Sequence, residues 1–233
     1  MNSRRTNAIF IKQLQDTIKN KAILVQFLMF PVMASILSLS VSDFGLGQFY
    51  FVNMFSAMYT TMAPIIVLST VISEEKEQGS LKLLMMSNVK PIEYMLGISA
   101  FVLTLCSIGV IFMGIVGGYT GMDLTYFILT NIMGILLSIL VGSCVGLRAK
   151  NQSSATSLSV PIMLLFSFVP MLSMFNPNIA SYGKILYSQQ VSNMLTDIAN
   201  GIFSLTIDSG LIILANGIIF LTLYIISFRK ILK

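Results

Sequence analysis

Apolar residues occupy six long runs of this 233-residue chain, and polar or charged stretches separate them. A helix needs about 20 apolar residues to cross the hydrocarbon layer of a membrane. Each run reaches this length, so the pattern predicts an all-α membrane protein with six transmembrane helices. Their expected ranges are 22–41, 51–72, 94–118, 126–147, 154–174 and 209–228, with a short outer loop at 42–48.

The first 21 residues combine five basic residues with one acid, and Ile9, Phe10, Leu14 and Ile18 recur among them at helical spacing. This pattern favours an amphipathic helix on the inner membrane face. We therefore expect an interfacial helix over 1–21 and a six-span domain over 22–233. A secretory signal peptide is the alternative, which a long basic region without an A-x-A-like cleavage site disfavours.

Residues 73–91 form the only long polar interruption in the first half of the chain and carry six charges. A Glu or Lys at the bilayer centre costs roughly 2.5 to 3.5 kcal/mol, so we expect this stretch to be a loop in water. Within it, Leu81 to Met86 are compatible with a short helix that ends near Asn88 and Pro91. An exposed Leu-Met helix in a cytosolic loop indicates a docking surface.

Residues 175–208 are the longest segment outside the predicted spans. Val191, Leu195, Ile198 and Ile202 fall at steps of four, three and four. This spacing predicts an amphipathic helix, which we expect to dip into the outer leaflet as a re-entrant segment.

Basic residues set the expected orientation. With both termini and the 73–91 loop inside, Lys184 is the only one of the 14 Lys and Arg residues on the outer side. This is a strong positive-inside signal. The net charge of +5 is therefore a feature of topology and does not indicate a nucleic-acid partner.

Composition excludes several classes of function. The chain is 55% hydrophobic and 10% charged, and it has no histidine, no tryptophan and no GxxxxGK[ST] phosphate loop. We therefore expect no catalytic residue and no metal site, and any ATPase must be another chain. Cys106 and Cys144 fall in apolar runs and are expected to pack as small hydrophobes. No predicted span has a charge near its centre, which disfavours an ion-coupled carrier.

The fourth predicted span carries a stripe of small residues, Gly134, Ser138, Gly142 and Gly146. Small residues at every fourth position let a neighbouring helix approach closely. We expect this neighbour to belong to the same chain, with a dimer contact as the alternative.

Residues 72–97, ISEEKEQGSLKLLMMSNVKPIEYMLG, resemble the intracellular loop of ABC-2-type (type V exporter-like) permeases. That family has an acidic E-x-E-x-G-[TS] run, a leucine-rich coupling helix, and a Pro and a Gly at the start of the third span. The matching positions are Glu75, Glu77, Gly79 and Ser80, then Leu81 to Met86, then Pro91 and Gly97. Ile98 departs from the Lys of many members. The match covers about a tenth of the chain, and the rest agrees in architecture.

The resemblance implies the permease subunit of a bacterial ABC exporter, a multi-pass protein of the plasma membrane with both termini in the cytoplasm. It would pair with a second permease, identical or different, and with two separate ABC ATPase subunits. ATP and Mg would be held by those subunits, so this chain would bind no cofactor and would not be an enzyme. The implied ATPase-coupling residues are Glu75, Glu77, Gly79, Ser80, Leu81, Leu83, Leu84, Met85 and Pro91. A plain connecting loop is the alternative for this stretch.

In this family the second and fifth spans line the transport pathway. The implied lining residues are Met54, Met58, Tyr59, Met62, Met163, Met171 and Met174. An uncharged, flexible wall suits apolar or amphipathic cargo such as a peptide, a bacteriocin or toxin, or a drug. Pro64, Pro161 and Pro170 would mark bends. The alternatives are an ABC-2 permease for lipid-linked saccharide, one for immunity-type peptide extraction, and a non-transporting membrane sensor or assembly subunit.

Overall fold

A computed structural model of the protein describes residues 3–40, 49–202 and 206–229, so the expected outer loop at 42–48 lies outside the described residues. Within these ranges the chain forms ten helices and no strand. The helices are α1 (Ser3–Lys19), α2 (Lys21–Ser40), α3 (Tyr50–Glu77), α4 (Ser80–Met86), α5 (Pro91–Val116), α6 (Gly121–Arg148), α7 (Gln152–Ser173), α8 (Pro177–Gly183), α9 (Tyr187–Ala199) and α10 (Ile207–Arg229).

Six of the described helices are long and apolar enough to cross a membrane: α2, α3, α5, α6, α7 and α10. They coincide with the six predicted runs, and the prediction of an all-α membrane protein is confirmed. The prolines Pro31, Pro64, Pro161 and Pro170 lie inside helices that continue past them. The largest differences from the expected ranges are at two helix ends, since α3 continues to Glu77 and α6 begins at Gly121.

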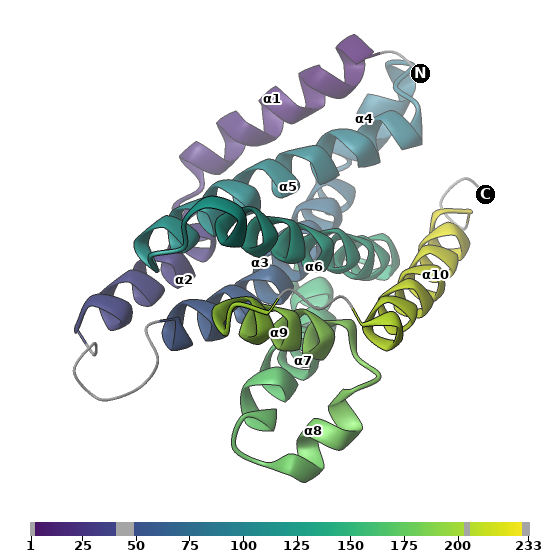
Figure 1. Ribbon diagram of the computed structural model, residues 1–233. Coiled ribbons are helices and arrows are strands. Elements are labelled where there is room, and N and C mark those ends of the chain that lie inside the picture. The colour runs from purple at the N-terminus through teal and green to yellow at the C-terminus, as the bar shows by residue number, and fades with distance from the viewer. Residues whose placement is uncertain (1–2, 41–48, 203–205, 230–233) are drawn as a thin grey trace.

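Helix α3 is the centre of the bundle, with α2, α5, α6, α7 and α9 packed around it (Figure 1). Its buried serine and threonine hydroxyls are satisfied by carbonyl groups of the helix itself. The Thr60 hydroxyl donates to the Ala57 carbonyl (2.9 Å), and the Ser69 hydroxyl donates to the Ile66 carbonyl (2.9 Å). Back-bonding to the previous turn removes most of the cost of burying a hydroxyl. The polar side of α3 therefore packs inside the protein.

The small-residue stripe of α6 lies against α3. A Cβ built on Gly142 would lie 2.8 Å from the Pro64 carbonyl oxygen and 2.9 Å from Ile65 Cα, and one on Gly146 would lie 3.1 Å from the Leu68 carbonyl oxygen. Such distances to backbone atoms leave no room for a side chain. The stripe thus serves packing within the chain, as expected.

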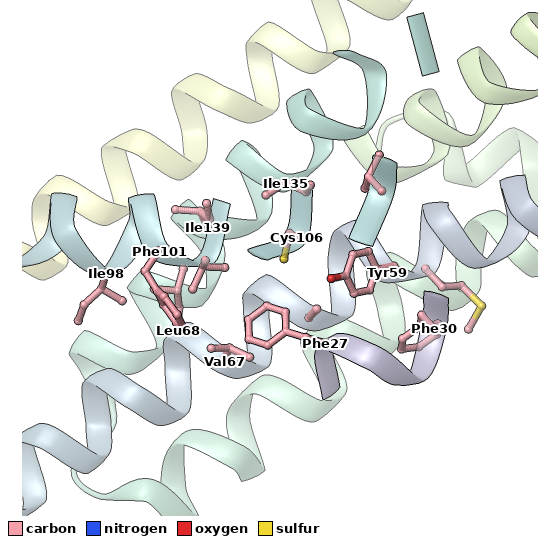
Figure 2. Packing of buried hydrophobic residues seen from close by; sticks show 14 of the residues in the cluster. Phe27, Phe30, Tyr59, Val67, Leu68, Ile98, Phe101, Cys106, Ile135 and Ile139 are labelled. Atoms are coloured by element: carbon pink, nitrogen blue, oxygen red, sulfur yellow. The ribbon is translucent and has the colours of Figure 1, made fainter. Parts of the chain in front are cut away.

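Aromatic and aliphatic side chains from α2, α3, α5 and α6 fill the space between these helices (Figure 2). Phe27 meets Phe101 edge to face, with ring centroids 6.3 Å apart. Tyr59 is fully buried beside Phe30 and Gly109. The two cysteines are free and buried, consistent with a packing role.

The segment 175–208 contains the expected amphipathic helix, which is α9. Val191, Leu195 and Ile198 of α9 are buried in the protein core, where α9 packs on α3 and α6. Ile202, the fourth residue of the predicted pattern, follows the end of α9 and is exposed. Polar contacts hold α9 in place: the Tyr187 and Ser138 hydroxyls are 2.7 Å apart, and Asn53 Nδ2 donates to the Leu195 carbonyl (3.0 Å). The predicted amphipathic helix is confirmed and its apolar face packs on protein, whereas the expected dip of this segment into the outer leaflet stays a prediction.

Candidate functional site

Helix α4 is a seven-residue helix outside the six long helices, framed by two residues with positive φ. Gly79 precedes it with φ +71°, and Asn88 follows it with φ +63°. A Cβ on Gly79 would meet nothing within 4 Å, so the backbone conformation and not space requires glycine there. Pro91 then occupies the first turn of α5, and the Lys90 backbone N–H donates to the Glu93 carboxylate (3.1 Å). These local features fix α4 between two sharp turns.

Helix α1 packs along α5 and reaches the ends of α3 and α4 (Figure 1). Lys12 Nζ forms an ion pair with Glu75 of α3, and Gln13 Nε2 donates to the same carboxylate oxygen at 2.6 Å. Arg5 Nη1 donates to the Asn88 carbonyl, and the same nitrogen lies 3.8 Å from Glu93 Oε2. One helix thus binds the last turn of α3, the turn that follows α4 and the start of α5.

The last turn of α3 also contacts α6 and α7. Lys76 Nζ donates to the carbonyl oxygens of Leu147 (2.8 Å) and Ala149 (2.6 Å) at the end of α6. The backbone N–H of Gln152, at the start of α7, donates to Glu77 Oε2 (2.9 Å). A cation at a helix C-terminus and a carboxylate at an N-terminus are both favourable for the helix dipole. Glu75, Lys76 and Glu77 therefore each tie α3 to a different helix, and we call these three residues the junction.

The junction lies in a helix, whereas residues 73–91 were expected to form a loop in water. Residues 73–77 are the last turn of α3, and Glu75 is only 6% exposed. The charges were expected to keep this stretch in water, but Glu75 is compensated inside the protein by Lys12 and Gln13. Only residues 78 and 79 separate α3 from α4.

The expected coupling residues of α4 fall into two sets. Leu81 is buried, and Leu84 and Met85 are half-buried against the core. Leu83 is 63% exposed and Met86 is 75% exposed. Ser80 donates to the Glu75 carbonyl (3.1 Å) and so joins α4 to the junction.

Gly97, matched to the family pattern, lies under α1. A Cβ there would be 2.8 Å from Ile9 Cβ and 3.0 Å from the Thr6 carbonyl oxygen. The absence of a side chain lets α1 approach α5, which positions Lys12 and Arg5.

The expected pathway residues do not form one surface of this chain. Tyr59 is fully buried between α2, α3 and α5, and Met58 and Met163 are buried as well. Met54, Met62 and Met171 are half-buried, and Met174 is 38% exposed. Tyr59 therefore does not line an open surface.

Sequence reasoning missed Arg5, Lys12, Gln13 and Lys76 as site residues. Signals for two of them are present in the chain: Gln13 lies four residues after Ile9 on the buried side of α1, and Lys76 is a cation inside an acidic run. The partners of both are distant in sequence, so only the fold shows them.

The site consists of one short exposed helix and the junction that joins it to the bundle. Within the described residues, no group of His, Cys, Asp and Glu could hold a metal ion. Glu75, Lys76 and Glu77 each bind a group on another helix, whereas Lys82 of α4 is exposed. This arrangement fixes the relative positions of α1, α3, α4, α6 and α7.

A family model described as "ABC-2 family transporter protein" matches residues 2–229, nearly the whole chain. No curated protein matches the chain in sequence. The match agrees with six apolar helices and with a permease subunit that works with ABC ATPase subunits. The chain belongs to the ABC-2 family of transporter proteins.

Proposed function

We propose that this chain is the permease of an ATP-driven exporter and that α4 is the surface through which a separate ATPase subunit drives it. The observation that carries the proposal is the exposure of Leu83 (63%) and Met86 (75%) on a helix outside the six long ones. Large apolar side chains on a short exposed helix are typical of a helix that docks in a partner's groove.

A groove beside α4 supports a partner of defined charge. Its volume is about 670 Å³, and Leu81, Met85 and Val89 line it together with Lys76, Lys82 and Lys90. No acid lines it, since Glu75 and Glu77 point to α1 and α7. The ATPase surface that fits here is apolar at its centre and acidic around it.

The junction supplies a route for motion. Because two residues join α4 to α3, a displacement of α4 pulls on the end of the central helix. The end of α3 is bonded to three other helices: Glu75 binds α1, Lys76 binds α6 and Glu77 binds α7. Rigid helices joined at one point move together, as a two-state rearrangement requires.

The direction of transport and the cargo are further parts of the proposal. An apolar or amphipathic cargo is supported by the six long helices, in which every described charged residue lies near a helix end; outward movement is the direction that we propose for it. Met54, Met62, Met171 and Met174 keep partly open positions suitable for a pathway wall between this permease and a second one. Both termini would be cytoplasmic in the plasma membrane, with ATP and Mg on the ATPase.

The test is affinity purification of the tagged chain from its native membranes in mild detergent, followed by mass spectrometry and an ATPase assay. A P-loop ATPase is expected with wild type and to be lost with Leu83→Glu. Gln15→Glu, which adds the same charge to an exposed position of α1, is the matched control and should retain the ATPase. Absence of an ATPase from the wild-type eluate, or its retention by Leu83→Glu, would overturn the proposal.

A second pair of variants tests the charge of the groove. Lys82→Glu is expected to weaken ATPase co-purification, whereas Lys184→Glu, an exposed lysine after α8, should not. Equal behaviour of the two variants would refute an acidic partner surface without touching the role of Leu83.

A further inference from the structure

An apolar groove of about 380 Å³ runs between α6, α7 and α10, away from α4. Val141, Val145, Leu158, Ile162, Phe166 and Phe220 form most of its wall. The single charged residue that lines it is Arg148, the last residue of α6. Val141 lies seven residues before Arg148, so the groove extends roughly 10 Å along α6 from the charge.

Arg148 keeps its positive charge available in this position. Its Nε donates to the Ser227 hydroxyl of α10 (2.9 Å), and the side chain is exposed. Among the residues that the structure describes, no carboxylate forms an ion pair with Arg148. Glu77, the acid that contacts the adjacent turn, binds the Gln152 backbone N–H.

Two further basic residues follow in sequence at the same end. Lys150 comes two residues after Arg148, and Arg229 comes two residues after Ser227. The end of a membrane-spanning helix is where hydrocarbon meets water. The groove therefore presents an apolar wall in the hydrocarbon layer and a basic cluster at its edge.

We propose that this groove binds an anionic phospholipid, with an acyl chain along Val145 and Phe166 and the phosphate at Arg148. Basic pockets between transmembrane helices bind anionic head groups. Each basic residue near such a head group favours it about five-fold over a zwitterionic one. The bound lipid fills the space between α10 and α7 and holds α10, the least buried of the six described long helices, against the bundle.

The test is native mass spectrometry of the purified protein after mixing with equal amounts of phosphatidylglycerol and phosphatidylcholine. Wild type is expected to retain phosphatidylglycerol in preference, and Arg148→Gln to lower that retention about five-fold. Arg148→Lys keeps the charge and should keep the preference. Leu158→Trp, which fills the apolar wall from α7, should lower phosphatidylglycerol retention while the charge remains.

Two controls separate lipid binding from helix packing. Ser227→Ala removes the bond to Arg148 but not the charge, so retention should equal that of wild type. Lys184→Gln removes a charge elsewhere and should also have no effect. Equal retention of the two lipids by wild type would overturn the proposal, and so would unchanged retention by Arg148→Gln or Leu158→Trp. None of these results depends on an ATPase partner.

Discussion

The ion pair between Lys12 and Glu75 predicts unequal effects for its two halves. Glu75 is 6% exposed, whereas the Lys12 side chain is 40% exposed. Lys12→Met keeps the apolar stem but leaves a buried carboxylate with Gln13 as its donor and the Tyr94 hydroxyl beside it. Glu75→Gln leaves an ammonium group that already reaches water. The lysine substitution should therefore destabilise the docking of α1 more than the glutamate substitution does.

The size of each effect on the free energy of α1 docking follows from the exposure of Glu75 and Lys12. An uncompensated buried charge costs about 3 kcal/mol, the low end of the usual range, because Gln13 still donates to it. Loss of a hydrogen bond to a charged group costs about 1.5 kcal/mol when the other group is rehydrated. The double variant removes both charges, so it should cost about 1.5 kcal/mol and not the sum of the two.

Hydrogen–deuterium exchange of the α1 amides measures this docking directly. Each 1.36 kcal/mol lost from the free energy of opening raises the exchange rate tenfold. Exchange should therefore accelerate about 150-fold for Lys12→Met, and about 12-fold for Glu75→Gln and for the double variant. Asp16→Asn is the matched control, because Asp16 forms an exposed pair with the same lysine at 4.0 Å. Equal effects of the two single variants, or an additive double variant, would refute the reasoning.

Gly97, Gly142 and Gly79 give further predictions, and Gly217 serves as a control. Gly97→Val should displace α1, because its Cβ would lie 2.8 Å from Ile9, and trypsin should then cleave α1 faster than in wild type. Gly142→Val should cost about 1 to 3 kcal/mol by clashing with the α3 backbone, seen as a lower unfolding midpoint. Gly217→Val, where the nearest atom is a flexible leucine methyl at 3.4 Å, should leave that midpoint unchanged. Gly79→Ala forces a Cβ into a positive-φ turn and should destabilise the α3–α4 connection by about 1 to 2 kcal/mol, measured as faster amide exchange in α4. Wild-type behaviour of any of these three variants would contradict its prediction.

Hydropathy was sufficient to find the membrane helices. A run of 20 apolar residues has few alternatives to a membrane helix, so the six long helices could be read from local composition. The end of α3 could not, because Glu75, Lys76 and Glu77 are stable in the helix only through partners on α1, α6 and α7. Those partners lie about 60 to 75 residues away in sequence.

The helical spacing of apolar residues predicted α9, but it did not predict what covers the apolar face of this helix. Val191 and Leu195 would form an apolar face whether lipid or protein covers it. Tyr187 and Ser138 decide between the two, since their hydrogen bond holds α9 to α6. The same limit applies to α4, where spacing alone did not separate buried Leu81 from exposed Leu83.

Photo-crosslinking at Met86 tests the central proposal most directly. A photoreactive residue at this position, which is 75% exposed, should form an adduct with a P-loop ATPase in native membranes. The same residue at Leu28, an exposed position on α2, should give no ATPase adduct. An ATPase peptide joined at position 86 would place the docking surface on α4. Adducts at position 86 with lipid alone, or with this chain alone, would contradict the proposal.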